Sequence, residues 1–542
     1  MEFFHSHVLS IILLTPLVGA IAALFVPGRY ENFHRLWGNL WGMLGLVVAL
    51  PLVWWFNPDS TQRFQFIESA DWIPSIGARY TLGIDGISFL LVMLTVLLGA
   101  ISILSAWSAI KPRKKEFYVL FLLLQVGMLG VFMSLDFFLF YVFWEITLVP
   151  MYFLIGIWGS DRRLYAAIKF FLYTLAGSVL MLLAILGMYF KYHEISGAYT
   201  FDVQTLMAAT PMFSLVVQKW LFWGLFFAFA IKVPMFPFHT WLPDAHTEAP
   251  TAGSVILAGV LLKMGAYGFL RFSVPMLPAA TKTAVWIIGI LSIIGIVYGA
   301  LVCMMQKDMK KLIAYSSVSH MGFVTLGIFA LTPQGIAGSV LQQINHGIST
   351  GALFLIVGVL YERRHTRLIS EFGGLSTPMP SFAAIYMIIT LSSLGLPLLN
   401  GFIGEFTILQ GVFEVNRQWA AWGVLGIILG AAYLLWLYQR AMFGPVTNPA
   451  NEHLPDLNLR EYCTLVPLVL FAFWIGLYPK PFFRYLDKPV QEIVQAVNPD
   501  YYKTATAGRP TSGATPIHGL AASTDAAADH AHENAASAQA GR

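Results

Sequence analysis

Residues 227–239 read Phe-Ala-Phe-Ala-Ile-Lys-Val-Pro-Met-Phe-Pro-Phe-His, an apolar run that holds one lysine and two prolines. The run continues an apolar block that begins near residue 216, so it has the length of a membrane-spanning helix. Pro234 and Pro237 lack the backbone N–H that a helix needs, and we expect them to break the span just after Lys232. A broken span is tolerated only where its freed backbone groups meet protein or water, so the sequence predicts a hydrated interior around Lys232.

Apolar blocks of this kind fill the rest of the chain. Of its 542 residues, 57% are hydrophobic and 11% are charged, whereas soluble chains carry about 25% charged residues. The composition therefore predicts an all-α polytopic membrane protein that lies in a lipid bilayer, and it excludes a water-soluble enzyme. A β-barrel is excluded as well, because its strands would alternate apolar and polar residues. The net charge is only +4 and no basic stripe occurs, so no nucleic acid is expected as a partner.

Run length predicts about fourteen transmembrane helices. They are expected near residues 8–26, 36–56, 84–109, 116–134, 137–158, 164–190, 216–239, 250–272, 282–306, 309–331, 334–361, 379–410, 418–442 and 461–479. Lys and Arg are more frequent in the loops after odd-numbered spans, for example at Lys111, Lys307 and Arg363. Because basic loops stay in the cytoplasm, this bias predicts that both chain ends are periplasmic.

The seventh and the twelfth span share a pattern, since each combines a charged residue with prolines or glycines. Two such broken helices, five spans apart, are typical of transporters built from inverted repeats. We therefore predict three N-terminal spans in 1–115, a first five-helix repeat in 116–272, a second, inverted repeat in 282–442, and the last span with its flank in 443–490. Residues 491–542 are expected to form a polar, disordered tail.

Six Glu, Lys and His side chains lie well inside the predicted spans, away from the span ends, and a charge at such a depth costs about 2.5–3.5 kcal/mol on insertion scales. They are Glu145, Lys232, Lys263, His320, His346 and Glu405. Groups of this kind face a protein interior or a water-filled cavity, and they are candidates for proton translocation by default.

Four of these candidates also have an alternative interpretation. Glu145 can be held in a static ion pair, and Lys232 can reach the interface along its aliphatic stem. A single buried histidine is commonly a packed hydrogen-bonding group. His320 and His346 nevertheless lie in neighbouring spans that also carry Ser, Gln and Asn, and an imidazole titrates near neutral pH, which favours a proton relay. Pro397 predicts a second break close to Glu405.

The polar residues just after the first break are ambiguous. His239, Asp244 and His246 can line a proton exit, or they can lie in an interfacial loop. A zinc or iron site at the two histidines lacks a well-spaced third ligand.

Four further charged residues, Asp85, Asp136, Lys169 and Arg271, lie near predicted span ends, where a charge is tolerated, and Arg271 is expected to extend to the interface.

The sequence contains no cofactor signature of its own. It has no GxGxxG motif after a strand, no phosphate-binding GxxxxGK motif and no CxxC pair, and its two cysteines, Cys303 and Cys463, stand alone in apolar surroundings. We therefore expect no catalytic redox group, no cofactor and no metal in this chain.

Three stretches resemble the antiporter-like subunits of respiratory complex I. They are Phe-Trp-Glu at 143–145, the long run from Ile231 to Ser254, and Leu-Ile-Ala-Tyr-Ser-Ser-Val-Ser-His-Met-Gly at 312–322. The resemblance covers nearly all of residues 1–490. Glu405 stands where the L and N branches of the family usually have lysine, so it favours the M branch, the counterpart of mitochondrial subunit four.

This resemblance implies a proton-translocating subunit in the membrane arm of NADH:quinone oxidoreductase, located in the bacterial inner membrane. The implied partners are other membrane-arm subunits, especially chains L and N, and those partner subunits would hold NADH, FMN, iron–sulfur clusters and quinone. The resemblance also implies roles for the candidates. Glu145 pairs with Lys232, Lys263 and the two histidines form a central relay, and Glu405 is the terminal group.

Three alternatives stay open at this point. The chain can belong to an Mrp-type sodium/proton antiporter, although Glu405 argues against it, or to the membrane part of a hydrogenase-like complex. It can also be a passive scaffold whose buried charges only hold helices together.

Overall fold

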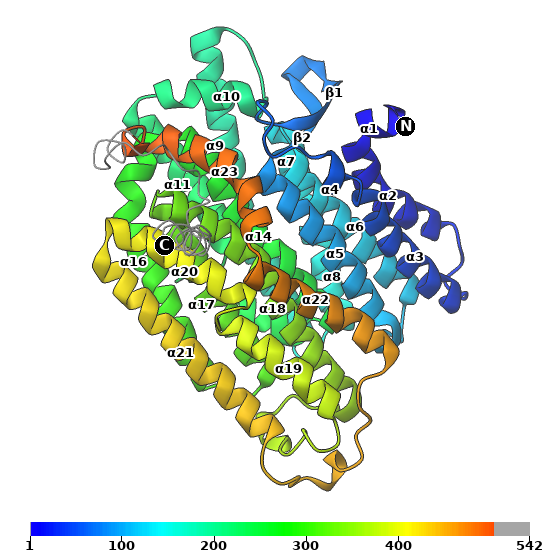
Figure 1. Ribbon diagram of the computed structural model, residues 1–542. Helices are drawn as coiled ribbons and strands as arrows, with labels where there is room; N and C mark the ends of the chain where they lie inside the picture. The colour runs from blue at the N-terminus through cyan, green and yellow to red at the C-terminus, as the bar shows by residue number, and fades with distance from the viewer. Residues whose placement is uncertain (1, 503–542) are drawn as a thin grey trace, which may run out of the picture.

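The computed structural model describes residues 2–502, and most of them lie in helices that run side by side (Figure 1). The first helices are α1 (Glu2–Ser6), α2 (Val8–Leu24), α3 (Glu31–Ala49), α4 (Leu52–Trp55), α5 (Gly86–Ala109), α6 (Lys114–Met133), α7 (Phe137–Ile146), α8 (Leu148–Trp158), α9 (Arg163–Ser196), α10 (Val203–Ala209), α11 (Leu215–Lys232) and α12 (Trp241–Glu248). The others are α13 (Thr251–Ile256), α14 (Leu262–Gly268), α15 (Val274–Met276), α16 (Pro278–Met304), α17 (Met309–Phe329), α18 (Pro333–Arg364), α19 (Pro380–Ser393), α20 (Asn400–Val415), α21 (Arg417–Met442), α22 (Leu459–Leu477) and α23 (Lys480–Val497).

The class predicted from composition, a polytopic helical membrane protein, is confirmed. Within the described residues, 12 helical stretches are long and apolar enough to cross a membrane. Two of the predicted spans are not among them. The span predicted at 8–26 is the shorter helix α2, and the span predicted at 379–410 is divided into α19 and α20.

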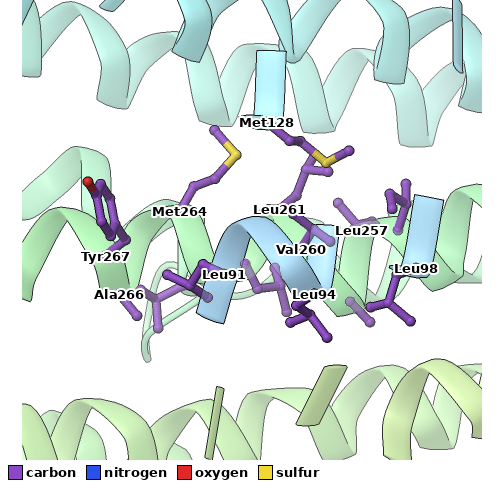
Figure 2. Close-up of a cluster of buried hydrophobic side chains, with 14 of the residues drawn as sticks. Leu91, Leu94, Leu98, Met128, Leu257, Val260, Leu261, Met264, Ala266 and Tyr267 are labelled. Carbon is purple, nitrogen blue, oxygen red and sulfur yellow. The ribbon is translucent and has the colours of Figure 1, made fainter. Parts of the chain in front are cut away.

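The centre of the bundle is the stretch Thr251–Met276 together with α17 and α18. In Thr251–Met276, all residues of the most apolar 18-residue stretch are buried (100%), whereas in α21 only 39% of the residues in the corresponding stretch are buried. Figure 2 shows leucines of α5 packed against the side chains of this central stretch. Gly259 allows this approach, because a methyl group there would collide with Leu98. Central helices can therefore carry polar side chains that never meet lipid.

Two predicted spans are irregular close to their charged residues. Pro150 has no N–H to donate to the carbonyl of Ile146, and the fifth span changes from α7 to α8 at Thr147. The seventh span ends at Lys232, and α12 begins only at Trp241. The Trp241 indole donates a hydrogen bond of 2.9 Å to the carbonyl of Ile231 and so satisfies a group that the break frees.

A second break separates α19 from α20. The chain between Ser393 and Asn400 contains Pro397 and turns through left-handed backbone conformations at Gly395, with φ +83°, and at Leu398, with φ +74°. The location of this break agrees with the sequence-based expectation. Glu405 lies in the second turn of α20, directly after it.

The polar stretch between the second and third span folds as a β-hairpin. Strand β1 (Gln65–Ile73) pairs antiparallel with β2 (Ala78–Ile84). The Glu68 carboxylate on β1 accepts hydrogen bonds from the backbone N–H groups of Leu9, at 2.8 Å, and Ser10, at 3.2 Å. The hairpin therefore caps the first turn of α2.

The last described helix, α23, is amphipathic and crosses the bundle (Figure 1). Its apolar face packs on α5, α15, α16 and α18, and its polar face pairs with the loop before β1, for example through Arg63 and Glu492 at 3.2 Å. The sequence places the start of a tail at residue 491, but residues 491–497 are the last turns of this helix. An amphipathic helix is missed by a search for uniformly apolar runs. The remainder of the predicted tail, 503–542, lies outside the described residues.

Gly86 offers a test of the contact between α5 and α23. A methyl group at Gly86 would overlap the backbone carbonyl of Tyr485, so Gly86→Ala must displace α23. Overpacking costs about 1–3 kcal/mol, and we expect amide hydrogen exchange in α23 to accelerate about tenfold or more. Gly156→Ala is the control, because its methyl would meet no atom closer than 3.6 Å. Equal exchange in both variants would show that α23 is not held at this point.

Candidate functional site

The six candidate residues lie on six different helices. Lys263, His346, His320 and Glu405, from α14, α18, α17 and α20, form two directly contacting pairs at the centre of the bundle. Glu145 on α7 and Lys232 at the end of α11 lie near the break of the seventh span.

The first pair consists of Lys263 and His346. The Lys263 ammonium lies 2.6 Å from His346 Nδ1 and also donates to the carbonyl of Ala258. Residues Leu257–Leu261 are π-helical, a geometry that leaves backbone carbonyls without their regular partner. The Lys263 side chain is fully buried, so these two contacts replace its hydration.

The second pair consists of His320 and Glu405. His320 Nδ1 lies 2.9 Å from Glu405 Oε1, and the Gln342 amide donates to the same oxygen at 2.9 Å. The centroids of the His320 and His346 rings are 5.9 Å apart. The Nε2 atoms of both rings are buried and have no hydrogen-bond partner within the described residues. A single small polar group can bridge rings at this separation.

Lys232 lies beside the irregular point of the fifth span. Its ammonium is 3.5 Å from Thr147 Oγ1 and 5.3 Å from the centroid of the Trp144 ring. Among residues 2–502, no ion pair within 4 Å joins Lys232 to Glu145, and Glu145 Oε1 is buried without a hydrogen-bond partner. The two groups therefore belong to one neighbourhood but are not in contact.

The polar residues after the first break differ from one another. His246 is fully buried, stacks on Phe354 with centroids 4.6 Å apart, and neither of its ring nitrogens has a partner in the described chain. His239 is also buried, against Tyr298. Asp244 is partly exposed and pairs with Lys169 at 2.7 Å. Only Asp244 has the exposure of an interfacial loop residue.

Arg271 does not extend to the interface, so that expectation is wrong. Its guanidinium is 3% exposed and pairs at 2.6 Å with Asp85, which caps the N-terminus of α5. It also donates to Ser88 and Tyr267 and lies over the ring of Phe64. A charge near the end of a span is tolerated at the interface, but here Phe64, in the loop before β1, and helix α23 cover that end, so the arginine needs a partner.

Several other buried polar residues were not predicted as part of the site. Asn345 and Asn400 contact each other next to the second break, and Ser392 donates to Asn400. Lys310, at the start of α17, is buried and donates to the carbonyl of Ala249. Asn400 within Leu-Pro-Leu-Leu-Asn-Gly was the available signal, since a buried amide beside a proline needs a partner.

Acids, amines and imidazoles arranged in this way inside a helical membrane bundle define a class of protein that moves protons or small cations through its own interior. Comparison with known proteins agrees. Residues 134–430 match the family model described as NADH:quinone oxidoreductase/Mrp antiporter, TM.

Three relatives identify the family. The chain is 46% identical to NADH-quinone oxidoreductase subunit M of Rhodobacter capsulatus over 93% of this chain and 100% of that protein. It is 47% identical to NADH-ubiquinone oxidoreductase chain 4 of Arabidopsis thaliana over 90% of this chain and 97% of that protein. A chain in the structure of respiratory complex I from Thermus thermophilus with bound NADH is 32% identical and superimposes with a TM-score of 0.82, covering 90% of this chain and 100% of that chain. The chain therefore belongs to the subunit M/chain 4 family of NADH:quinone oxidoreductase.

The Asp85–Arg271 pair offers a second test. Arg271→Met leaves a buried carboxylate without its partner, and we expect a loss of about 3–5 kcal/mol of stability. Adding Asp85→Leu removes the stranded charge, so the double variant should regain most of this stability, except for about 1 kcal/mol for the N-cap that Asp85 provides to α5. Thermal unfolding of the subunit within the purified complex measures both. Additive losses would mean that the two side chains do not form a pair.

Proposed function

We propose that this chain is a proton-translocating subunit of the membrane arm of an NADH:quinone oxidoreductase. The observation that carries the proposal is the run of buried contacts from Lys263 through His346 and His320 to Glu405. Every member of this run can gain and lose a proton, and each side chain comes from a different helix.

The geometry suits stepwise transfer. A proton on Lys263 Nζ can pass to His346 Nδ1 along the 2.6 Å contact, and that imidazole can release one from Nε2. One water molecule can carry it between the two rings, whose centroids are 5.9 Å apart. His320 then passes a proton from Nδ1 to Glu405 Oε1 over 2.9 Å. After this transfer each imidazole carries its proton on the other ring nitrogen, so a ring flip or a proton exchange through water must reset both rings. Glu405 must also pass its proton on, and Lys263 must gain a new one, before the next transfer.

Glu145 and Lys232 control the other end of this run. A charge pair at about 4 Å with an effective dielectric constant of 20 is worth about 4 kcal/mol. Bringing Glu145 and Lys232 together would hold a proton on the lysine, and separating them would release it. The position of Lys232 beside Thr147, two residues after Glu145, supports such a movement. His246 lies on α12, just after the first break, and within the described residues neither of its ring nitrogens has a hydrogen-bond partner, so it is available as a further proton carrier.

We also propose about fourteen spans, arranged as two inverted five-helix repeats in 116–272 and 282–442. The breaks after Lys232 and before Asn400 support this arrangement, because each lies next to a buried ionisable group. The basic loops support a periplasmic location for both chain ends, in a bacterial inner membrane.

The proposed partners are the other membrane-arm subunits, in particular chains L and N. NADH, FMN, iron–sulfur clusters and quinone would bind to partner subunits. The sequence supports this assignment, because it contains no motif for any of these groups.

Lys232→Met tests the proposed function. The substitution keeps the length of the side chain and removes its proton, so we expect NADH-driven proton pumping to fall by about tenfold or more while the complex still assembles. Proton uptake into sealed vesicles, measured beside NADH oxidation and a native gel, provides the readout. Lys219→Met is the matched control, because Lys219 lies on the same helix but is exposed, and pumping should be unchanged.

A scaffold function predicts a different pattern. If the buried charges only hold helices together, replacing Glu145 and Lys232 together by apolar residues should preserve assembly and pumping. Normal pumping in that double variant would refute the proposed proton route.

A further inference from the structure

Amide side chains join α18 to the broken twelfth span, and the proton route proposed above does not use them. Gln342, Asn345 and Asn400 are at most 2% exposed. Burying an amide without hydrogen bonds costs several kcal/mol, so three of them at one helix contact need a specific explanation.

Two of the amides bind each other across the break. Asn345 Nδ2 donates to the Asn400 carbonyl at 2.6 Å, and Asn400 Nδ2 donates to the Asn345 carbonyl at 3.4 Å. Ser392, near the end of α19, donates from Oγ to Asn400 Oδ1 at 2.5 Å. We call Asn345, Asn400 and Ser392 the amide clasp. It ties the first residue of α20 both to the middle of α18 and to the helix that precedes the break.

The clasp holds a backbone conformation that is unfavourable on its own. Leu398 has a φ of +74°, a region that costs a non-glycine residue about 1–2 kcal/mol. Such a conformation persists only where the surroundings fix it. Its side chain is 64% exposed and gives little packing in return. The backbone of Leu398 also lies close against Gly476 on α22, so the break is fixed from two sides.

The third amide acts on Glu405 directly. Gln342 lies three residues before Asn345 on α18, so the two amides face the same segment of α20. Its Nε2 donates at 2.9 Å to the carboxylate oxygen that also contacts His320. Gly404 permits this approach, because a Cβ there would collide with Gln342 Oε1. The amide therefore restricts where the carboxylate can point.

We propose that Gln342, Asn345 and Asn400 are positioning residues for proton transfer at Glu405. The amide clasp fixes the start of α20, and Gln342 then holds the carboxylate in contact with His320. This inference rests on the proposed function, in which Glu405 receives the proton.

The experiment compares two neighbouring glutamines in the intact oxidoreductase. Gln342→Met removes the donor to Glu405 with little change in volume. Gln343→Met is the matched control, because Gln343 is equally buried but, within residues 2–502, its amide donates only to Ser339 of its own helix, at 3.3 Å. Infrared difference spectroscopy follows the carboxylic band of Glu405, assigned by its loss in Glu405→Gln. Proton pumping is measured on the same membranes.

We expect the proton affinity of Glu405 to rise about tenfold in Gln342→Met, because one hydrogen bond to a charged group contributes at least that factor. Pumping should fall in the same variant. Gln343→Met should leave both the band and the pumping unchanged. Equal behaviour of the two variants would overturn the role of Gln342, since a purely structural glutamine would not move the titration of Glu405.

The clasp is tested by a second pair of variants. Asn345→Leu should weaken the contact between His320 and Glu405 and change the carboxylic band, although Glu405 itself is intact. Leu398→Gly relieves the strained conformation without touching the clasp, so its band should stay as in the parent protein. An unchanged band in Asn345→Leu would refute the clasp. If Asn345→Leu fails to assemble, Ser392→Ala, which removes one hydroxyl, takes its place with the same expected change.

Different outcomes distinguish the proposed function from the positioning role of Gln342. Normal pumping in Glu405→Gln would overturn the proposed function itself. Lost pumping in Glu405→Gln, combined with normal pumping and an unshifted band in Gln342→Met, would overturn only the positioning role.

Discussion

A charged side chain in a membrane bundle must find its partners on other helices, and this constraint organises the protein around Lys263. Its ammonium is satisfied by the Ala258 carbonyl and by His346. The first partner exists because the chain before Lys263 is π-helical, and the second because α18 runs alongside. These contacts require the stretch Thr251–Met276 and α18 to pack without lipid between them, and the most apolar window of Thr251–Met276 is fully buried. The remaining helices then serve to enclose this polar centre.

Proline provides the other organising device, since it interrupts helices where a charge is needed. Next to each break, a side chain donates a hydrogen bond to a backbone carbonyl. The Trp241 indole binds the carbonyl of Ile231 after the first break, and the Asn345 amide binds the carbonyl of Asn400 after the second. Broken helices are stable in lipid only when their backbone groups have such partners. This explains why polar residues cluster next to the first break, at Pro234 and Pro237, and next to the second, at Pro397.

The sequence allowed the class of the protein, the two breaks and the buried ionisable residues to be predicted, because composition, proline and charge act locally. It did not allow the pairs to be predicted. Asp85 and Arg271 each lie near the end of an apolar run, and only the cover formed by Phe64 and helix α23 makes them a buried pair. Helix α23 itself was missed because it is amphipathic. The π-helical turn before Lys263 contains no proline, so the sequence gives no local sign of it. The contact of Lys263 with Ala258 therefore depends on packing that a single sequence does not reveal.

Two sets of buried charges in this protein differ both in their chemistry and in their location. Arg271 with Asp85, and Arg363 with Glu461, join helices near the ends of the bundle. An arginine does not release its proton in a protein, so such pairs are fixed anchors. The contacts that link Lys263, His346, His320 and Glu405 contain no arginine. All four can change their protonation state, and their partners are neutral amides, imidazoles and carbonyls that can adapt to either state. The arginine pairs near the ends keep their charge and hold the helices together, while the four central groups can gain and lose protons. This arrangement lets the bundle stay assembled while protons move through it.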